Sequence, residues 1–326
     1  MRFIARIGCG LLLSACGANL NTSAIQAPVA GAAIPRNVAP DRSKPKLYVV
    51  NNQGGAVTAY RATADGNAAP AISISGSNTQ LSTPINLAVN AKGIAFVTNL
   101  GSDAVTEYSA GSNGNIAPIA TITCAGLNLP DGIALDDAGN IYVANLQANS
   151  ISIFKKNANG CVAKTAQISG RKTRLSRPAA LLISGSVLFA GNIDSHSVTE
   201  YATSARGNAA PSAEIAGSKT MLANPVGLAL DGAGNLYVAD DSAQAIFVFG
   251  TGAHGNQSPI RTIQGSLTQL GSPSGIVLKS GSIIVTDPAT NSITSYPETA
   301  NGNVAPSSVI DGSKTGLNFP VGLALH

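Results

Sequence analysis

The amino-acid sequence predicts an all-β protein, a six-bladed β-propeller with four-stranded blades, and three observations support this fold class. A short apolar strand that ends in Asn or Asp recurs at intervals of 48, 46, 47, 48 and 47 residues. The residues that end it are Asn51, Asn99, Asn145, Asn192, Asp240 and Asp287. The copies also share a proline-led strand and a glycine-rich turn. A fixed period of this length, built from short strands, is typical of a propeller with one blade per copy.

Each copy of the repeat contains four expected strands. The first follows a proline, as in Pro130-Asp-Gly-Ile-Ala-Leu, and the second is the strand that ends in Asn or Asp, as in Ile141-Tyr-Val-Ala-Asn. The third ends in an aromatic residue, as in Val105-Thr-Glu-Tyr, and the fourth follows a Gly-Asn-x-Ala-Pro turn. Gly and Asn tolerate positive φ, and proline has no N–H to offer a neighbouring strand. This turn therefore suits the entry to an outermost strand.

The order of the strands predicts how the ring closes. The repeats begin on a second strand at Leu47 and end on a first strand at Val321 to Leu325. We therefore expect the C-terminal strand to become the innermost strand of the N-terminal blade, which leaves no open sheet edge. The expected domains are a signal peptide at 1–15, a disordered tether at 16–46 and the propeller at 47–326.

The composition of the chain limits the class of partner. Hydrophobic residues make up 44% of the 326 residues and charged residues only 11%. This balance is typical of an all-β protein built for an exterior compartment. Residues 47–326 hold 14 basic and 15 acidic side chains. A nearly neutral domain lacks the many cations that phosphate binding needs, so we expect no nucleic acid partner.

The N-terminus carries the pattern of a bacterial lipoprotein signal. Arg2 and Arg6 precede an apolar run that is too short to span a bilayer, and Leu13-Ser-Ala-Cys16 resembles a lipobox. The resemblance implies cleavage before Cys16 and attachment of diacylglycerol to its sulfur. Gly17, rather than Asp, follows the cysteine, which in such lipoproteins implies sorting to the outer membrane. We therefore expect a cell-envelope protein, anchored in the bilayer through Cys16 and facing the periplasm or the exterior; the alternative is an ordinary secretory signal with a chance cysteine.

Two cysteines remain within the repeats. An oxidising compartment permits a disulfide between Cys124 and Cys161. Cys124 falls at the end of an outer strand, however, and we expect Cys161 in a turn at the opposite face. The sequence leaves this pairing open and disfavours it.

The repeat resembles that of the NHL family of six-bladed propellers. The motifs that carry the resemblance are Pro-x-Gly-(Ile/Leu)-Ala-Leu-Asp and the Gly-Asn-x-Tyr-Val-Ala-(Asn/Asp) that follows it, as at 130–145 and 225–240. The resemblance covers nearly all of residues 47–326. It implies the fold and leaves the function open, because propellers host unrelated activities.

Residues that recur in nearly every blade are expected to hold the fold. The Asn and Asp side chains that end the second strands should cap adjacent turns by accepting backbone N–H groups. The aromatic residues of the second and third strands should pack between blades. Function is expected where the repeat breaks.

The residue after the proline of each first strand should lie at the mouth of the central channel. Most of these residues are apolar, so Asp131 and Ser274 stand out. At the following position of each first strand the residue is Gly or Ala in every blade except one, where it is Asn86. Asp241 and His196 belong to loops of the same face. These five residues are the candidate ligand-binding set at the channel mouth.

A basic segment in the third blade is a second candidate site. The connection to the fourth blade carries Arg171, Lys172, Arg174 and Arg177. Because this connection shares a face with the channel mouth, it could bind an anionic partner such as a polysaccharide or a lipid head group. The alternative is a solvated loop without a ligand.

A metal-dependent lactonase is the enzyme alternative. Related six-bladed propellers of the gluconolactonase and SMP-30 type hold Ca²⁺ or Zn²⁺ at the mouth, and Pro130-Asp131-Gly132 resembles one of their ligand motifs. The resemblance also calls for an asparagine and an N-terminal glutamate as metal ligands. Here the asparagine is displaced by one position, to Asn86, and no glutamate precedes Glu107. A hard divalent ion requires several oxygen ligands. Of the ligands that the resemblance implies, only Asp131 matches.

We therefore predict a monomeric, membrane-tethered binding scaffold without a cofactor and with no assigned catalytic residue. Its partner would be an envelope protein or a glycan. The lactonase centred on Asp131 is the rival prediction, and a structural envelope protein without a small ligand is the third.

Overall fold

The computed structural model describes residues 46–123 and 126–326. The expected signal peptide, Cys16 and nearly all of the expected tether therefore lie outside the described residues. So does Cys124.

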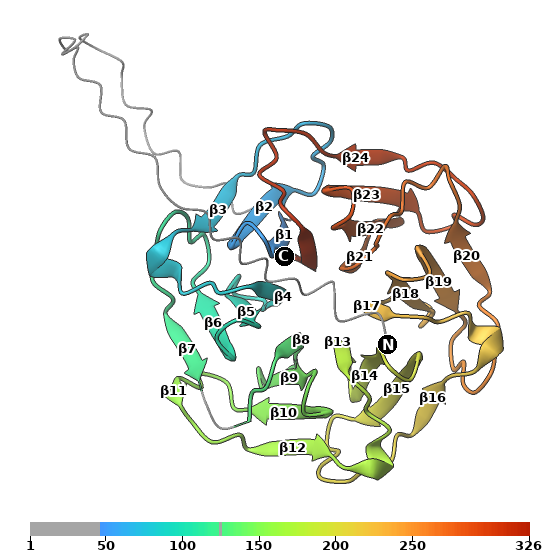
Figure 1. The fold of residues 1–326 in the computed structure, drawn as a ribbon, viewed down its shortest axis with the longest axis horizontal. Helices are drawn as coiled ribbons and strands as arrows, with labels where there is room; N and C mark the ends of the chain where they lie inside the picture. Colours follow the sequence, from blue (N-terminus) through green and yellow to red (C-terminus); the bar gives the residue numbers. More distant parts are fainter. Residues whose placement is uncertain (1–45, 124–125) are drawn as a thin grey trace, which may run out of the picture. The chain divides into compact units, whose positions relative to one another are not determined.

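Six sheets surround a central axis as the blades of a propeller (Figure 1). The strands of the first two blades, from the axis outward, are β25 (Pro320–Leu325), β1 (Lys46–Asn51), β2 (Ala56–Arg61) and β3 (Ile72–Ser75), then β4 (Pro84–Val89), β5 (Ala95–Asn99), β6 (Ala104–Tyr108) and β7 (Ala120–Thr123). Blades three and four contain β8 (Pro130–Leu135), β9 (Ile141–Asn145), β10 (Ser150–Phe154) and β12 (Ala166–Ser169), then β13 (Pro178–Ser184), β14 (Val187–Asn192), β15 (Ser197–Ala202) and β16 (Ala213–Ile215). Blades five and six contain β17 (Pro225–Leu230), β18 (Leu236–Asp240), β19 (Ala245–Phe249) and β20 (Arg261–Gln264), then β21 (Ile276–Lys279), β22 (Ser282–Asp287), β23 (Ser292–Pro297) and β24 (Ser308–Ile310). The predicted fold class is confirmed.

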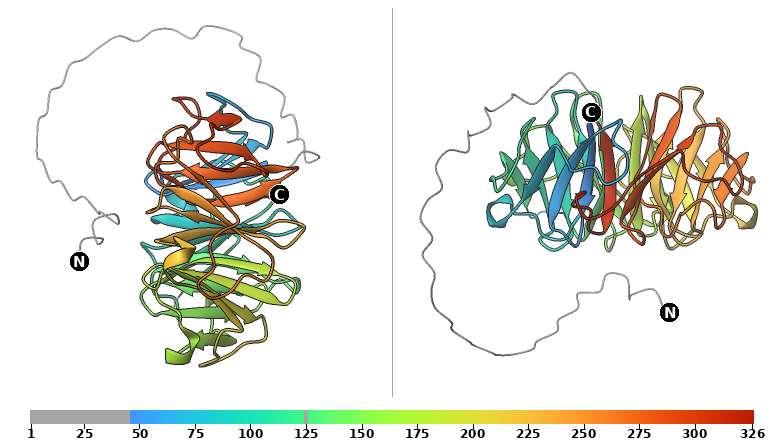
Figure 2. Two further views of the ribbon diagram at one scale, coloured as in Figure 1. Left: turned by 90° about the vertical axis from the view of Figure 1, so that its right-hand side faces the viewer. Right: turned by 90° about the horizontal axis from the view of Figure 1, so that it is seen from above.

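The ring closes as predicted, through the C-terminal strand. β25 pairs antiparallel with β1, and Leu47 lies opposite Leu325; Figure 2 shows the two strands side by side. The strand begins at Lys46, one residue earlier than expected, because Lys46 exchanges backbone hydrogen bonds with His326 at 2.6 and 3.0 Å. The first and the last strand of the propeller thus belong to the same blade.

We call the face that carries the loops between second and third strands, together with the connections between blades, the upper face. The opposite face is the lower face. The residues that end the second strands form a ring just below the upper face, and all six are fully buried. Asn145 Oδ1 accepts the N–H of Asn128 at 3.0 Å, and the Asp240 carboxylate accepts the N–H groups of Ala223 and Asn224 at 2.8 Å. Their predicted capping role is confirmed.

The hydrophobic core is divided among the interfaces between the blades. The aromatic residues that end the third strands are fully buried there, and the hydroxyl groups of the four tyrosines among them reach the connections between blades. Tyr60 donates to the Thr315 carbonyl at 2.6 Å, and Tyr108 donates to the Thr79 carbonyl at 2.5 Å. The predicted packing role of these aromatic residues is confirmed.

A belt of contacts around the outside of the ring was not predicted. The Gly of each Gly-Asn turn lies parallel to the fourth strand of the preceding blade; within the described residues these are five single bridges, such as Ile74 with Gly114. In blade three, where Cys161 replaces the Asn, the two-residue strand β11 (Gly160–Cys161) lies beside β7 in the same way. The Asn of the turn then caps the connection of that neighbouring blade. Asn115 Oδ1, for example, accepts the Asn78 N–H at 2.8 Å. The Gly-Asn pair joins blades as well as turning the chain.

This belt corrects the expected position of Cys161. Instead of remaining at the opposite face, the segment runs along the neighbouring blade, and Cys161 lies in register with Thr123 at the end of β7. Cys161 is disulfide-bonded, and its partner lies outside the described residues. Cys161 therefore lies beside the end of β7, and its position no longer disfavours a bond to Cys124.

Candidate functional site

The innermost strands carry a bulge at their upper end, directly after the proline. In β8, Pro130 lies opposite Asn145 and Ile133 opposite Val143, so Asp131 and Gly132 together face a single residue of β9. A β-bulge bends the strand and re-aims side chains, and bulges are common beside functional sites. The bulge is the local reason that Asp131 leaves the regular in–out alternation of its strand. We keep the term channel mouth for this upper end of the six innermost strands.

The second bulge position is normally glycine because neighbouring inner strands approach closely there. A Cβ at Gly227 would lie 2.0 Å from the carbonyl oxygen of Ser274, and one at Gly132 would lie 2.7 Å from that of Ala179. Asn86 of β4 occupies the same position with a full side chain. Its amide hydrogen-bonds to the carboxyl of Asp131 on the next blade. The two residues that depart from the repeat, Asn86 and Asp131, are therefore in contact with each other.

The backbone of Asp131 is held by the same neighbouring blade. Thr98 of β5 is fully buried, and its hydroxyl donates to the carbonyl oxygen of Asp131 at 2.7 Å. Thr98 Oγ1 also accepts the N–H of Asn86 at 3.1 Å. Thr98 thus fixes both residues of the pair.

The environment of Asp131 raises its pKa to about 7, from an ordinary value of 3.8. The largest cause is burial, because low-dielectric surroundings disfavour the charged form. The Asn86 hydrogen bond and the charge of Arg177 act in the opposite direction and lower the pKa. The side chain is half-buried. Asp131 therefore changes its charge near neutral pH.

An apolar cluster lies beside Asp131 in the upper part of blades two to five. Leu100, Leu146 and Ala179 are buried, and partly buried apolar residues pack against them. Those partly buried residues are Ile85, Leu129, Ile193 and Val226. Ile85 and Ala179 are the channel-mouth residues of the blades on either side of Asp131. The polar group at the mouth therefore has an apolar frame.

The basic segment does not form a single cationic surface. Arg171 and Lys172 are exposed on the 3-10 helix η3 (Arg171–Thr173), whereas Arg174 forms an ion pair with Glu214 of β16. Arg177 Nη1 lies 3.5 Å from Asp194 Oδ1, and Arg177 is also the cation that acts on Asp131. One member of the predicted basic loop therefore acts on one member of the predicted channel-mouth set, Asp131, to which Asn86 is hydrogen-bonded.

The other three candidates are not in contact with this pair: Asp241 and His196 lie in loops of the upper face, and Ser274 lies at the mouth in another blade. Asp241 accepts from Asn224 Nδ2 at 2.6 Å and from Ser242 Oγ at 2.9 Å. His196 is exposed on the loop after β14, with Nδ1 against the Ala223 carbonyl. Ser274 precedes β21, where its N–H donates to the Thr286 carbonyl at 2.9 Å.

Sequence reasoning separated Arg177 from Asp131, although a signal was present. Arg177 directly precedes Pro178, so it adjoins the channel-mouth position of its blade. Its backbone has a φ of 50°, a left-handed conformation that few side chains adopt. Its N–H donates to Asn149 Oδ1 at 2.6 Å, which fixes the turn.

The donors around Asp131 do not fit a divalent cation. They comprise one carboxylate and one amide, and the neighbouring Arg177 guanidinium repels a second cation. Among residues 46–123 and 126–326, no three or more His, Cys, Asp or Glu side chains are grouped so that they could hold a metal ion. Over the same part of the chain, no helix has the length and apolar character to cross a membrane.

Comparisons with known proteins support the fold. No protein-family model matches the sequence, and no curated protein matches it. Among solved structures, a chain of a nidogen–laminin complex is 15% identical over 86% of this chain and 98% of its own, with a TM-score of 0.61. A streptogramin B lyase is 15% identical over 85% of this chain and 82% of its own, with a TM-score of 0.57. A protein of unknown function from Desulfotomaculum acetoxidans is 13% identical over 86% of this chain and 98% of its own, with a TM-score of 0.57.

Proposed function

We propose that this chain is a membrane-tethered, extracytoplasmic binding module that docks an envelope protein or a glycan on its upper face. The contact would centre on Asn86, Asp131 and Arg177. The observation that carries the proposal is the half-buried carboxyl of Asp131, with a pKa of about 7, beside a guanidinium and an apolar cluster. A few converging polar groups within an apolar frame are characteristic of binding sites.

The chemistry of these three side chains suits a partner with hydroxyl or amide groups. The Arg177 guanidinium donates only, the Asn86 amide both donates and accepts, and the Asp131 carboxyl accepts, or donates when it is protonated. A partner that excludes water from the mouth would strengthen each of these interactions. The apolar frame would contribute through the surface that the partner covers.

The resemblance to NHL repeats and to a lipobox supports the rest of the proposal. In this view Cys16 carries lipid, the chain is held at the outer membrane, and the propeller acts as a monomer. Replacing Cys16 with serine should move the protein from the membrane fraction to the soluble fraction and abolish labelling by a clickable fatty acid. Unchanged membrane association of Cys16→Ser would contradict the tether and leave the binding face untouched.

The binding face can be tested by comparative capture. The full-length chain, the double variant Asn86→Ala/Asp131→Ala and the control Lys279→Ser on the lower face would each be immobilised and exposed to envelope extract and to a glycan array. We expect a protein or glycan that the wild type and the control retain, and that the double variant retains at least about tenfold less. Identical retention by all three proteins would reject the upper face as the contact surface.

A hydrolase or lyase centred on Asp131 is the second candidate function. A carboxyl that titrates near pH 7 is suited to act as a general base at neutral pH. Three solved structures with this fold are named as streptogramin B lyase or virginiamycin B lyase. The test is a screen with lactones, with and without Ca²⁺ or Zn²⁺, comparing the wild type with Asp131→Asn. Turnover that the variant loses would favour the enzyme, and elemental analysis of the purified chain would test the metal.

A further inference from the structure

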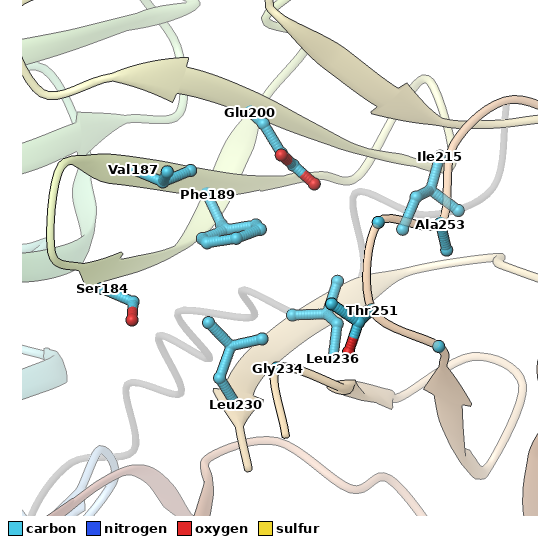
Figure 3. Close-up of a pocket in the computed structure, with 12 residues that line it drawn as sticks. Ser184, Val187, Phe189, Glu200, Ile215, Leu230, Gly234, Leu236, Thr251 and Ala253 are labelled. Carbon is cyan, nitrogen blue, oxygen red and sulfur yellow. The ribbon is translucent and has the colours of Figure 1, made fainter. Parts of the chain in front are cut away.

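A second recessed site lies on the lower face, between blades four and five, away from the channel mouth. Figure 3 shows the residues that line it. It has a volume of about 200 Å³. Its walls are apolar, and the side chains that form them are Val187, Phe189, Ile215, Leu230 and Leu236. Pockets for drug-sized ligands typically measure roughly 300–1,000 Å³, so an occupant of this pocket would be small.

One ionisable side chain enters this pocket. Glu200 of β15 lies directly across from Phe189 of β14, and Figure 3 shows its carboxyl pointing into the space beside the Phe189 ring. In the part of the chain that the structure describes, no hydrogen bond or ion pair is found for this carboxyl. Burial raises the pKa of Glu200, and the charge of His254, on the loop after β19, partly offsets this effect. The carboxyl is thus a desolvated acceptor that a cationic ligand would stabilise.

A comparison with the other blades shows that the Phe–Glu pair is a departure from the repeat. In blades one, three and five, the same two positions hold a tyrosine opposite an apolar residue: Tyr48 with Ala59, Tyr142 with Ile153, and Tyr237 with Val248. In blade two, Phe96 lies opposite Glu107, as Phe189 lies opposite Glu200. A glutamate therefore accompanies each phenylalanine that replaces the tyrosine.

The two Phe–Glu pairs differ in what covers them. Around Glu107 the groove between blades two and three is filled by Ile94, Leu135 and Val162 among others, and Glu107 is only 5% exposed. At Glu200 the rim is formed by small residues, with Gly250, Thr251 and Gly252 in the positions that Lys155, Lys156 and Asn157 hold in blade three. Blade four also has a short turn between β13 and β14, at Gly185 and Ser186. The Phe–Glu pair is therefore covered in the groove between blades two and three and open in the groove between blades four and five.

We propose that the pocket between blades four and five binds a small organic cation, a primary amine attached to an apolar ring or chain. The ammonium group would pair with the Glu200 carboxylate, and the apolar part would lie against Phe189 and Leu236. Charge complementarity selects the amine, because the carboxyl has an apolar surround that rejects free ions but accepts an amphiphilic one. This site is independent of the upper face.

The test uses 2-phenylethylamine as the probe and 2-phenylethanol as its neutral isostere, with the full-length chain in calorimetry at about pH 8, where the amine is charged. We expect one molar equivalent of amine to bind, and the alcohol to bind at least about tenfold more weakly. Glu200→Gln should weaken amine binding at least about tenfold and leave the affinity for the alcohol unchanged. The matched control Glu107→Gln removes the equivalent carboxyl of the sealed groove and should bind the amine as the wild type does.

A second variant keeps the test decisive if Glu200→Gln fails to fold. Ala253→Leu adds bulk to the pocket wall and keeps the carboxylate, so amine binding should be lost while the melting temperature stays close to that of the wild type. No binding of 2-phenylethylamine to the wild type would overturn the proposal. So would equal binding by Glu200→Gln or by Ala253→Leu, or equal weakening by Glu107→Gln.

Discussion

Two groups of polar side chains lie near the upper face, and they differ in how they are satisfied. The ring that ends the second strands has one member in every blade, each fully buried and each accepting backbone N–H groups of the adjacent connection. The channel mouth has one amide, one carboxyl and one guanidinium, each from a different blade. Its carboxyl carries a raised pKa rather than a full set of partners. Repeated polar residues therefore hold this fold, whereas the isolated ones are the candidates for binding a ligand.

The most severe change would be to the framework that both groups share. Deleting residues 320–326 removes β25, and with it the backbone pairing of β1 and the apolar side chains of Val321 and Leu323. We expect the ring to open and the cooperative thermal transition to disappear, because the total stability of a domain is only about 5–15 kcal/mol. Circular dichroism melting would show this. A deletion of His326 alone is the control, and an unchanged melting temperature for the longer deletion would disprove closure.

The second effect tests the close approach of the inner strands at the mouth. Gly227→Ala places a Cβ 2.0 Å from the Ser274 carbonyl oxygen, so β17 and the segment before β21 must separate. We expect a loss of about 2–4 kcal/mol in the free energy of unfolding, measured in urea. Gly232→Ala is the matched control, because a Cβ there meets nothing within 4 Å. Equal stability of the two variants would mean that the second bulge position of the innermost strands does not need a small residue. Asn86 would then not be an exception at that position.

The third effect concerns the polar ring itself. Asn145→Ala removes the acceptor of the Asn128 N–H and the donor to Ser152 Oγ, both at 3.0 Å in a fully buried site. Because unpaired buried polar groups keep their desolvation cost, we expect a loss of about 2 kcal/mol in unfolding free energy. Asn86→Ala, at the half-buried mouth, should cost less than half as much. A reversal of this order would remove the distinction between the two groups.

The fold could be predicted from the sequence because its signal is repeated in every blade. The ring closure followed from the strand on which the repeats begin and end. The belt of Gly-Asn contacts could not be predicted, since each bridge involves about one residue and leaves no strand pattern. The pairing of Phe with Glu was not predicted, because it requires the register of the second and third strands. The opening beside Glu200 could not be predicted either, because it depends on the loop after β19 in the next blade, where Gly250 and Gly252 have no side chains to fill the groove.

The candidate site was predictable only in part, for a geometric reason. Asn86 and Asp131 stood out because they interrupt columns of apolar or small residues. Arg177 was assigned to another group because a sequence pattern does not give the direction of a side chain whose backbone has positive φ. Residues that share a column can be found by alignment, whereas residues that meet across blades require the bulges and turns that aim them.

The last prediction, the smallest when it is measured per pH unit, is specific to the mouth. The pKa of Asp131 is about 7 in the folded protein against an ordinary 3.8, so the folded state keeps a proton that the unfolded chain has released between these values. Stability must therefore fall as pH rises from about 4 to about 7, with a slope below 1.4 kcal/mol per pH unit because the side chain is half-buried. Asp131→Asn cannot ionise and lacks this slope. Relative to the wild type it should gain stability from about pH 4 to about pH 8 in urea titrations, and parallel curves for the two proteins would contradict the raised pKa. In Arg177→Ser the wild-type slope should extend to higher pH, because the guanidinium is one of the two influences that hold the pKa down.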